Sequence, residues 1–547
     1  MGRESFDLAV IGGGINGAAI ARDAAMRGLS VALIERGDFA GATSSRSSKL
    51  IHGGLRYLPQ GHLGLVRRAL AERERLRRLT APHLVRPLRF LFPLYRERGP
   101  GRLALGAGLW LYDLFARTPR AERHRSLSRA ATVAAEPILR SQGLVGGASY
   151  YDAEGDDARI TLENALDAAW HGAALANYVA LEGFSHIGSR IGAAGVRDRL
   201  GGASFELRAR VFINAAGPWL DDVRRLDAPA APPVIRLTKG VHLIFDRTRL
   251  PVGQALVLSD GAGRIVFVIP YGLSVLVGTT DTDFAGDREH VATDETDVAY
   301  LIYVLQLSLE TDLAAADVAA GFAGLRALGA AGDGRAPSAV SREEVIVESA
   351  SGLISVGGGK LTTHREIAER VVNRVASVLG RGGPSSPTRD TPLPGARPLR
   401  DEESVDGRDD RAVATRALGA LPADLRAAIV ARYGSRAAIV ARIAFESPEL
   451  AAPLADGCAV AAAEAVYAMR YEMATSVADF IVRRTALSWR NPRCVRAAAV
   501  ATARLMASEL GWDRARQETE AAACDTAGVP GPKAAVLNPG QDRRGLA

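Results

Sequence analysis

Hydrophobic and polar positions near the start of the chain follow a strand–turn–helix–strand order. The apolar run 8–11 predicts a strand, a helix-like stretch ends at Gly28, and a second apolar run, 31–34, stops at the acidic Glu35. Between the first strand and the helix stand three glycines in G-x-G-x-x-G spacing: Gly12, Gly14 and Gly17. This order of elements predicts a βαβ unit.

Each glycine of this turn has its own reason to lack a side chain. Gly12 permits the tight turn, Gly14 lets the backbone approach a pyrophosphate, and Gly17 lets the helix pack close to the strand. The N–H groups and dipole at the helix N-terminus favour an anion, and Glu35 is placed to bind ribose hydroxyls. The pattern predicts a dinucleotide site; a tight βα turn without a ligand is the alternative.

Further periodic segments predict the rest of the architecture. We expect an amphipathic helix over 65–79, a strand over 205–214, and several strands over 234–280 that form a separate sheet. Within that sheet the uncharged run 265–280, broken by Pro-Tyr-Gly, predicts a β-hairpin. A strand and turn over 345–356 lead into a second glycine-opened helix.

Composition limits the class of protein. A chain of 547 residues exceeds one core, so two or three domains are expected. Charged residues interrupt the N-terminus and no stretch reaches about 20 apolar residues, so neither a secretory signal nor a spanning helix is predicted. The three cysteines lie late and lack paired spacing, which predicts no metal site and suits a reducing cytoplasm.

The net charge is +7, which suits an anionic substrate, an acidic lipid surface or nucleic acid, or is merely a basic surface. Lysine is rare beside arginine. Lys49, Lys239 and Lys360 each lie within a glycine- or histidine-containing motif, so these positions are candidates for a specifically required ammonium. Lys533 lies in the tail.

Residues 103–116 form a short apolar stretch flanked by arginines. This segment either dips into a membrane interface, with Leu109 and Trp110 facing the lipid, or is a core helix with basic ends. Both interpretations stay open at this point.

Three glycine-bearing segments, 12–17, 215–219 and 357–362, are far apart in sequence. In a doubly wound sheet such loops converge beyond the strand C-termini, where a large cofactor would touch all three. The segment 41–58 adds small and hydroxyl residues that suit a loop lying along a cofactor. It ends with an acid/base group, an anion ligand and a phenol: His52, Arg56 and Tyr57.

Eight motifs occur in order from residue 6 to about 380: IGGGINGA, ATSSRSSKLIHGGLRYL, NAAGPW, KGVH, IVFVIPY, VGTTDTD, GLRAL and GGGKLTT. Together they closely resemble the FAD-dependent glycerol-3-phosphate dehydrogenases. Ala327 departs from the pattern, since a proline is usual after the arginine, and the C-terminal tail matches nothing.

The resemblance implies non-covalent FAD, oxidation of sn-glycerol 3-phosphate at C2 to dihydroxyacetone phosphate, and transfer of electrons to a quinone. A phosphate dianion needs guanidinium and ammonium groups, and alcohol oxidation needs a base. Implied substrate contacts are Arg56, Tyr57, Thr280, Arg326, Arg342 and Lys360. Implied catalytic positions are Arg326 and Lys360 with His52 and His242, either of which could be the base.

The resemblance also implies which positions contact FAD. These are Gly12, Gly14, Ile15, Asn16, Gly17, Glu35, Thr43, Ser44, Ser45, Lys49, Leu50, Ala216, Gly217, Trp219, Gly359, Lys360, Leu361 and Thr362.

We therefore predict an α/β fold: a Rossmann-like FAD-binding domain, a β-sheet substrate domain and a C-terminal all-helical domain. The expected FAD-binding parts are 1–82, 146–220 and 323–383. The expected substrate or cap parts are 83–145 and 221–322. They are followed by a linker at 384–398, the helical domain at 399–515 and a partly disordered tail at 516–547.

Other functions remain as alternatives. A glycerol-3-phosphate oxidase would use oxygen in the same pocket. An RNA-modifying flavoprotein is disfavoured because the basic residues lack aromatic interleaving, and an amine-oxidising relative because a carboxylate needs fewer cations. Expected partners are the substrate, a quinone and the inner face of the cell membrane, bound peripherally, with no nucleic acid and with a homodimer left open.

Overall fold

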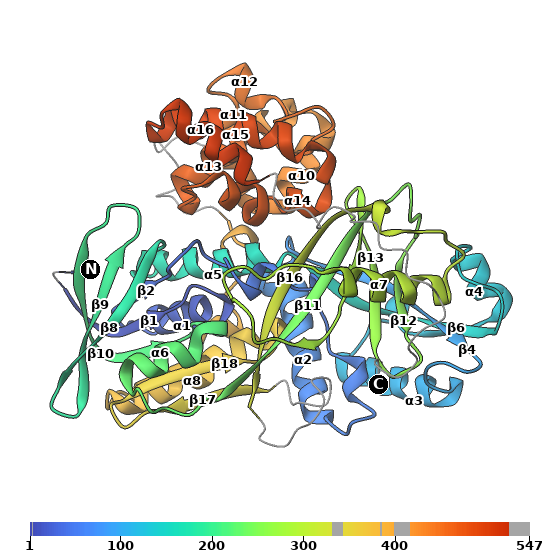
Figure 1. The fold of residues 1–547 in the computed structure, drawn as a ribbon, viewed down its shortest axis with the longest axis horizontal. Helices are drawn as coiled ribbons and strands as arrows, with labels where there is room; N and C mark the ends of the chain where they lie inside the picture. The colour runs from blue at the N-terminus through green and yellow to red at the C-terminus, as the bar shows by residue number, and fades with distance from the viewer. Residues whose placement is uncertain (3, 331–342, 383–384, 399–415, 525–547) are drawn as a thin grey trace.

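The computed structural model describes residues 1–2, 4–330, 343–382, 385–398 and 416–524. Figure 1 shows two β-sheets side by side, with a helical unit packed above their junction. The predicted α/β fold with a C-terminal helical region is confirmed.

The first sheet has the order β17-β18-β10-β1-β2-β7, in which the strands from β18 to β7 run parallel and β17 is antiparallel to β18. The antiparallel strands β8 and β9 extend the sheet from β10. Because both faces are covered, its central strands are apolar at successive positions, as in the run 8–11. Its strands are β1 (Ser5–Ile11), β2 (Val31–Ile34), β7 (Ala174–Ala176), β8 (Val179–Ile187), β9 (Arg190–Asp198), β10 (Ser204–Asn214), β17 (Glu344–Glu348) and β18 (Leu353–Gly358).

Helices α1 (Ile15–Met26), α5 (Asp157–Trp170) and α8 (His364–Val378) pack together on one face of this sheet. Helix α6 (Leu220–Asp227) and the β8–β9 hairpin cover the other face. This arrangement is the doubly wound architecture in which ligands bind beyond the strand C-termini.

The second sheet, here called the cap sheet, is mostly antiparallel, in the order β15-β11-β14-β13-β12-β4-β6-β3, with β16 on β11 and β5 on β6. The hairpin predicted over 265–280 is confirmed as β13 and β14. Its strands are β3 (Leu50–Ile51), β4 (Val85–Tyr95), β5 (Arg125–Ser128), β6 (Leu144–Gly155), β11 (Ile235–Asp246), β12 (Ala255–Ser259), β13 (Ile265–Tyr271), β14 (Ser274–Gly278), β15 (Thr282–Asp283) and β16 (Val318–Gly329).

The period-two alternation of β11 gives the cap sheet two different faces. Val241, Leu243 and Phe245 pack with α7 (Glu295–Ser308) in one core. The His242 side chain points the other way, toward the first sheet, and Gly240 lies on the same face. That second face also packs α2 (Leu63–Arg75) and α3 (Arg102–Ala116), whereas α4 (Arg129–Ala135) packs beside β6.

Helix α3 corrects one expectation about the apolar stretch 103–116. Leu109 is fully buried in the core beneath the cap sheet, so the expectation that it faces a membrane is wrong. Trp110 is 63% exposed. A single residue step thus separates a core residue from a surface one, because adjacent residues lie about 100° apart around the helix axis.

The C-terminal unit is helical, as expected, and its helices surround their own apolar cores. They are α10 (Ala423–Tyr433), α11 (Ala437–Ala444), α12 (Pro448–Ala451), α13 (Ala462–Glu472), α14 (Leu487–Arg490), α15 (Val495–Leu510) and α16 (Arg514–Ala523). Helix α16 occupies the start of the segment expected to be a tail; residues 525–547 lie outside the described residues.

Buried ion pairs fasten this unit to the first sheet. The Arg159 guanidinium of α5 contacts both oxygens of Glu472 at 2.7 and 2.9 Å, and both side chains are almost wholly buried. Arg484 binds the Asp38 carboxylate through two nitrogens at 2.6 and 2.8 Å. The connecting segment is also held, because Arg397 binds Asp167 at 2.7 Å.

We predict that breaking the Arg159–Glu472 pair from one side destabilises the protein more than removing both charges. Arg159→Met should cost about 3–5 kcal/mol, because it strands a buried carboxylate. Arg159→Met with Glu472→Leu should cost less than the single change. Urea unfolding measures both variants, and a double variant that loses the sum of the two single effects would contradict the prediction.

Candidate active site

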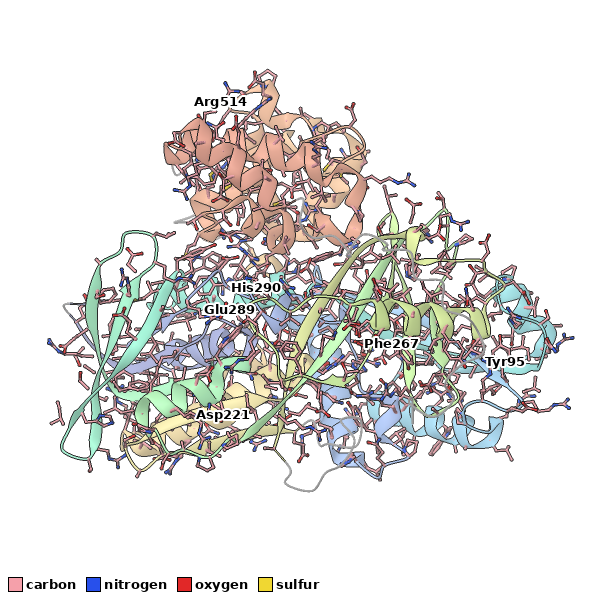
Figure 2. The ribbon with its side chains drawn as sticks, viewed as in Figure 1. Tyr95, Asp221, Phe267, Glu289, His290 and Arg514 are labelled. Carbon is pink, nitrogen blue, oxygen red and sulfur yellow. The ribbon has the colours of Figure 1, made fainter. Side chains whose placement is uncertain are left out.

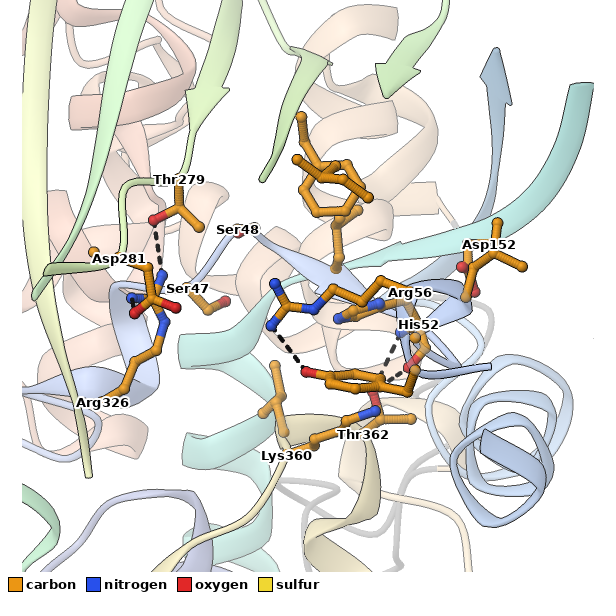
Figure 3. Close-up of a pocket in the computed structure, with 18 of the residues that line it drawn as sticks. Ser47, Ser48, His52, Arg56, Asp152, Thr279, Asp281, Arg326, Lys360 and Thr362 are labelled. Atoms are coloured by element: carbon orange, nitrogen blue, oxygen red, sulfur yellow. Dashed lines mark hydrogen bonds and ion pairs between the residues drawn. The ribbon is translucent and has the colours of Figure 1, made fainter. Parts of the chain in front are cut away.

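A cavity of about 900 Å³ lies between the two sheets. Distant parts of the chain form its walls: the glycine turn after β1, the segment 43–63, strands β11 and β16, and the turn after β18. Figure 3 shows Arg326 with Thr279 and Asp281 on one side, and Arg56, His52 and Lys360 on the other. The convergence predicted for the glycine-bearing segments is present at Gly14, Gly217 and Gly359.

In the glycine turn, the fold requires glycine at positions 12 and 17, whereas Gly14 borders open space. A Cβ on Gly17 would lie 1.8 Å from the Gly12 oxygen, and a Cβ on Gly12 would lie 2.5 Å from the Ala215 oxygen. A Cβ on Gly14 would meet only the Ser44 hydroxyl, at 3.2 Å, and would otherwise project into the cavity. The N-cap residue of α1, Gly14, has no side chain to cap the helix, so the N–H groups of its first turn other than that of Ile15, which donates to Ser44, fit an anion such as a pyrophosphate.

Glu35 supports this turn from behind. Its carboxylate accepts hydrogen bonds from the Gly13 and Gly37 N–H groups at 2.7 and 2.9 Å. Burial raises the pKa of Glu35, although these two hydrogen bonds favour the ionised form. The acid therefore ties the end of β2 to the glycine turn.

The segment 43–49 forms a wall whose hydroxyls bind both sheets. The Ser44 hydroxyl accepts the Ile15 N–H at 2.9 Å, and the Thr43 hydroxyl donates to the Leu325 carbonyl at 2.6 Å. The Lys49 ammonium is buried and binds Asp157 at 2.6 Å and the Ser45 carbonyl at 2.5 Å. Lys49 and Ser45 consequently lie behind the cavity wall rather than on it.

The two candidate histidines occupy different settings. His242 Nε2 lies 2.8 Å from the Ser48 hydroxyl, and its ring stacks on Phe322 with centroids 4.8 Å apart. Burial, with help from the Arg326 and Lys49 charges, lowers the pKa of His242 well below its usual value, so its imidazole is neutral at pH 7. Its Nδ1 makes no hydrogen bond within the described part of the chain.

His52 lies on the opposite wall, where it lines the cavity. Its backbone N–H donates to the Thr362 hydroxyl at 3.2 Å, which joins it to the turn after β18. Its ring meets the Phe267 ring edge-on at 6.3 Å.

Cationic groups gather around the Tyr57 ring. Arg56 donates to the Tyr57 hydroxyl at 3.0 Å and makes no ion pair with any described acid. The Lys360 ammonium lies 4.1 Å from the centre of the same ring and 3.4 Å from the Gly53 carbonyl. Across the cavity, Arg326 binds Asp281 at 3.2 Å and the Thr279 hydroxyl at 2.8 Å.

Most of the expected site residues line one cavity: Gly14, Ile15, Asn16, Thr43, Ser44, Leu50, His52, Arg56, Tyr57, Gly217, His242, Arg326, Gly359, Lys360, Leu361 and Thr362. Others lie outside its wall: Gly12, Gly17, Glu35, Ser45, Lys49, Ala216, Trp219 and Thr280. Arg342 lies outside the described residues.

Sequence reasoning missed Arg46. This guanidinium lines the cavity, donates to the Ala323 carbonyl at 3.1 Å and pairs with no described acid. Burial lowers its pKa, and the nearby Arg483 charge adds to that effect. Arg46 is the only charged residue in the hydroxyl-rich run 41–48, and that isolation was the available signal. The described residues contain no cluster that could hold a metal ion.

Comparison with known proteins defines the class. The family described as FAD dependent oxidoreductase matches residues 7–365, which include both sheets and most of the cavity wall. The family described as the C-terminal domain of alpha-glycerophosphate oxidase matches residues 386–517. The fold and the site are thus those of an FAD-dependent oxidoreductase.

Individual relatives show to which family of FAD-dependent oxidoreductases the chain is similar. Glycerol-3-phosphate dehydrogenase 2 of Mycobacterium tuberculosis is 37% identical over 95% of this chain and 88% of its own. The aerobic glycerol-3-phosphate dehydrogenase of Staphylococcus aureus is 35% identical over 94% and 93%. The crystal structure of the Bacillus halodurans glycerol-3-phosphate dehydrogenase complexed with FAD has a TM-score of 0.78 and 31% identity, covering 96% of this chain and 95% of that one. The chain belongs to the glycerol-3-phosphate dehydrogenase family.

The different surroundings of two glycines give a matched test of the cofactor site. Gly14→Val should fold but purify without flavin, because the new side chain fills the space in front of the α1 N-terminus. Gly17→Val should fail to fold, because its side chain has no space against the Gly12 carbonyl. Flavin absorbance and thermal unfolding distinguish the two variants; a Gly14→Val protein with full flavin content would contradict the assignment.

Proposed function

We propose that the protein oxidises sn-glycerol 3-phosphate at C2 to dihydroxyacetone phosphate, with FAD as hydride acceptor and a membrane quinone as the next electron acceptor. One observation carries the proposal: Arg56, Lys360 and two histidines surround a single cavity beside a glycine turn that fits a pyrophosphate. The names of the relatives support the same substrate.

The chain's own residues would hold the cofactor at the glycine turn and along the segment 43–50. Gly14, Ile15 and Asn16 would bind the pyrophosphate, and Gly359 to Thr362 would border the flavin from the turn after β18. When bound, FAD supplies a two-electron acceptor that no side chain can provide.

The substrate phosphate would bind at the Tyr57 ring. Arg56 and Lys360 both contact this ring, so two positive charges are held close together. A phosphate dianion relieves their repulsion and accepts charge-assisted hydrogen bonds from both groups. Arg326, held by Asp281 and Thr279, adds a third cation from the cap sheet.

We propose His52 as the base that accepts the C2 hydroxyl proton. It lies on the same segment as Arg56 and shares a wall with Lys360. His242 instead has Nε2 engaged with Ser48 and its ring fixed against Phe322. Its role is to hold the 47–49 segment in place as a neutral, buried group.

These roles predict different kinetics for two matched variants. His52→Gln should slow flavin reduction by glycerol 3-phosphate by roughly 10²–10⁴-fold with little change in substrate affinity, because a lost general base has that effect. His242→Gln should have a smaller effect on the rate. Anaerobic stopped-flow absorbance measures both, and the reverse order of rates would exchange the two assignments.

Helix α3 supports access by an apolar electron acceptor. Leu103, Trp110 and Leu114 form an exposed stripe, with Leu103 90% exposed. The adjacent face of the same helix, formed by Ala104, Gly108 and Leu111, lines the cavity. One helix therefore connects an apolar surface with the wall of the site.

We propose that this stripe binds the inner face of the cell membrane peripherally, helped by the flanking arginines. Within the described residues, no helix has the length and hydrophobicity needed to cross a bilayer. A quinone dissolved in the lipid would then enter beside α3. An oxidase that uses oxygen is the competing function, and it would not need this surface.

Replacing Leu103, Trp110 and Leu114 with serine should weaken capture by anionic liposomes and slow quinone reduction. Flavin reduction by substrate should stay unchanged, because these side chains point away from the core. Ile187→Ser is the matched control, since Ile187 is 78% exposed but lies on the β8–β9 hairpin. Loss of both half-reactions, or faster reoxidation by oxygen than by quinone, would contradict the membrane proposal.

A further inference from the structure

Residues 284–293, here called the clasp, connect β15 to α7. They leave the cap sheet and contact the first sheet's unit, which is the first sheet together with the helices that cover it. Figure 2 labels two of its residues, Glu289 and His290, beside that unit. We propose that the clasp retains FAD by closing the cap over the adenosine end of the cofactor site. This inference rests on binding of FAD at the glycine turn and not on the identity of the substrate.

Both ends of the clasp are fixed to one short part of β11. The Phe284 N–H donates to the Leu237 carbonyl at 3.0 Å. The Lys239 ammonium binds Asp294 at 2.5 Å and Asp297 at 2.6 Å. Leu237 and Lys239 are only about 7 Å apart along the strand. The nine residues between Phe284 and Asp294 must therefore project away from the sheet as a loop.

The tip of this loop binds the first sheet's unit through two charged residues. Arg288 donates to the Pro218 carbonyl at 3.1 Å and pairs with Asp222 at 2.8 Å. Glu289 pairs with Arg36, whose guanidinium lies 3.8 Å above the Trp219 ring. The clasp thus joins two segments that are separate in the first sheet.

These two segments flank the expected adenosine position. Arg36 directly follows Glu35, the acid at the end of β2, and in a βαβ dinucleotide site this acid lies beside the ribose of the adenosine half. Pro218 and Trp219 directly follow Gly217, in the segment after β10 that lies beside the glycine turn after β1. Arg36 and Glu289 are partly exposed, with side-chain exposures of 37% and 52%. The clasp therefore closes the solvent side of this end.

The contacts of the clasp are charged and partly exposed, so each of them should be weak and sensitive to salt. The test uses the purified holoenzyme, and the measured quantity is the FAD release rate, followed as the rise in free-flavin fluorescence after dilution. Arg288→Met with Glu289→Gln should accelerate release roughly two- to tenfold at low salt, because exposed ion pairs contribute modestly. At about 1 M salt, where screening reaches ~3 Å, wild type and variant should release FAD at similar rates.

Glu310→Gln is the control, because it removes the same charge from the cap at a site whose paired base, Arg140, lies 3.9 Å away. It should leave the release rate unchanged. The double variant Arg36→Met/Glu289→Gln should release FAD no faster than the faster of its two single variants, because both substitutions remove the same ion pair.

An unchanged release rate in the Arg288→Met/Glu289→Gln variant would overturn the clasp. So would an acceleration that persists undiminished at high salt, because that result would come from altered packing and not from the ion pairs. Failure of the cofactor placement is distinguishable, since Gly14→Val would then keep its flavin.

Discussion

The energetic cost of removing charged groups from water determines how the side chains around the cavity are arranged. An unpaired charge in a protein interior costs several kcal/mol, so buried ions need partners of opposite sign. Lys49 meets Asp157 and Arg73 meets Asp152, each at 2.6–2.7 Å, and these pairs fix the walls behind the site. Arg46 and Arg56 have no acidic partner among the described residues, and both face the cavity. The paired charges thus form the scaffold, while the remaining positive charge is directed at anionic ligands.

The same reasoning separates the lysines that sequence composition had grouped together. Lys49 and Lys239 each bind aspartates, and both are nearly buried, so their ammonium groups serve the fold. Lys360 instead lies on the cavity wall beside Tyr57. The scarcity of lysine therefore marked positions where an ammonium is needed. Whether that ammonium serves the fold or a ligand depends on acids that are 55 to 108 residues distant in sequence.

The sequence predicted those features that depend on local pattern. The βαβ turn, the 265–280 hairpin and the C-terminal helices follow from periodicity and from glycine spacing, and all are present. It could not predict which face of α3 is buried, because the run 103–111 is apolar on every side and gives no contrast between its faces; Leu109 was misplaced for that reason. Nor could it predict the clasp, whose contacts join Glu289 to Arg36 across 253 residues and leave no local signal. The role of Arg46 was visible only as an isolated charge.

The proposed reaction places two opposite demands on one cavity. A phosphate dianion must reach it from water, whereas a quinone must reach it from lipid. The lining of the cavity provides for both: cations from the segment after β3 and from β16 face it from two walls, and apolar residues of α3, namely Ala104, Gly108 and Leu111, form another part of its lining. Because α3 also contributes Leu109 and Tyr112 to the core, its position is fixed by packing and not by the membrane. The apolar route would then exist before the protein meets a bilayer, so membrane binding would change the supply of acceptor and leave oxidation of the substrate unaffected.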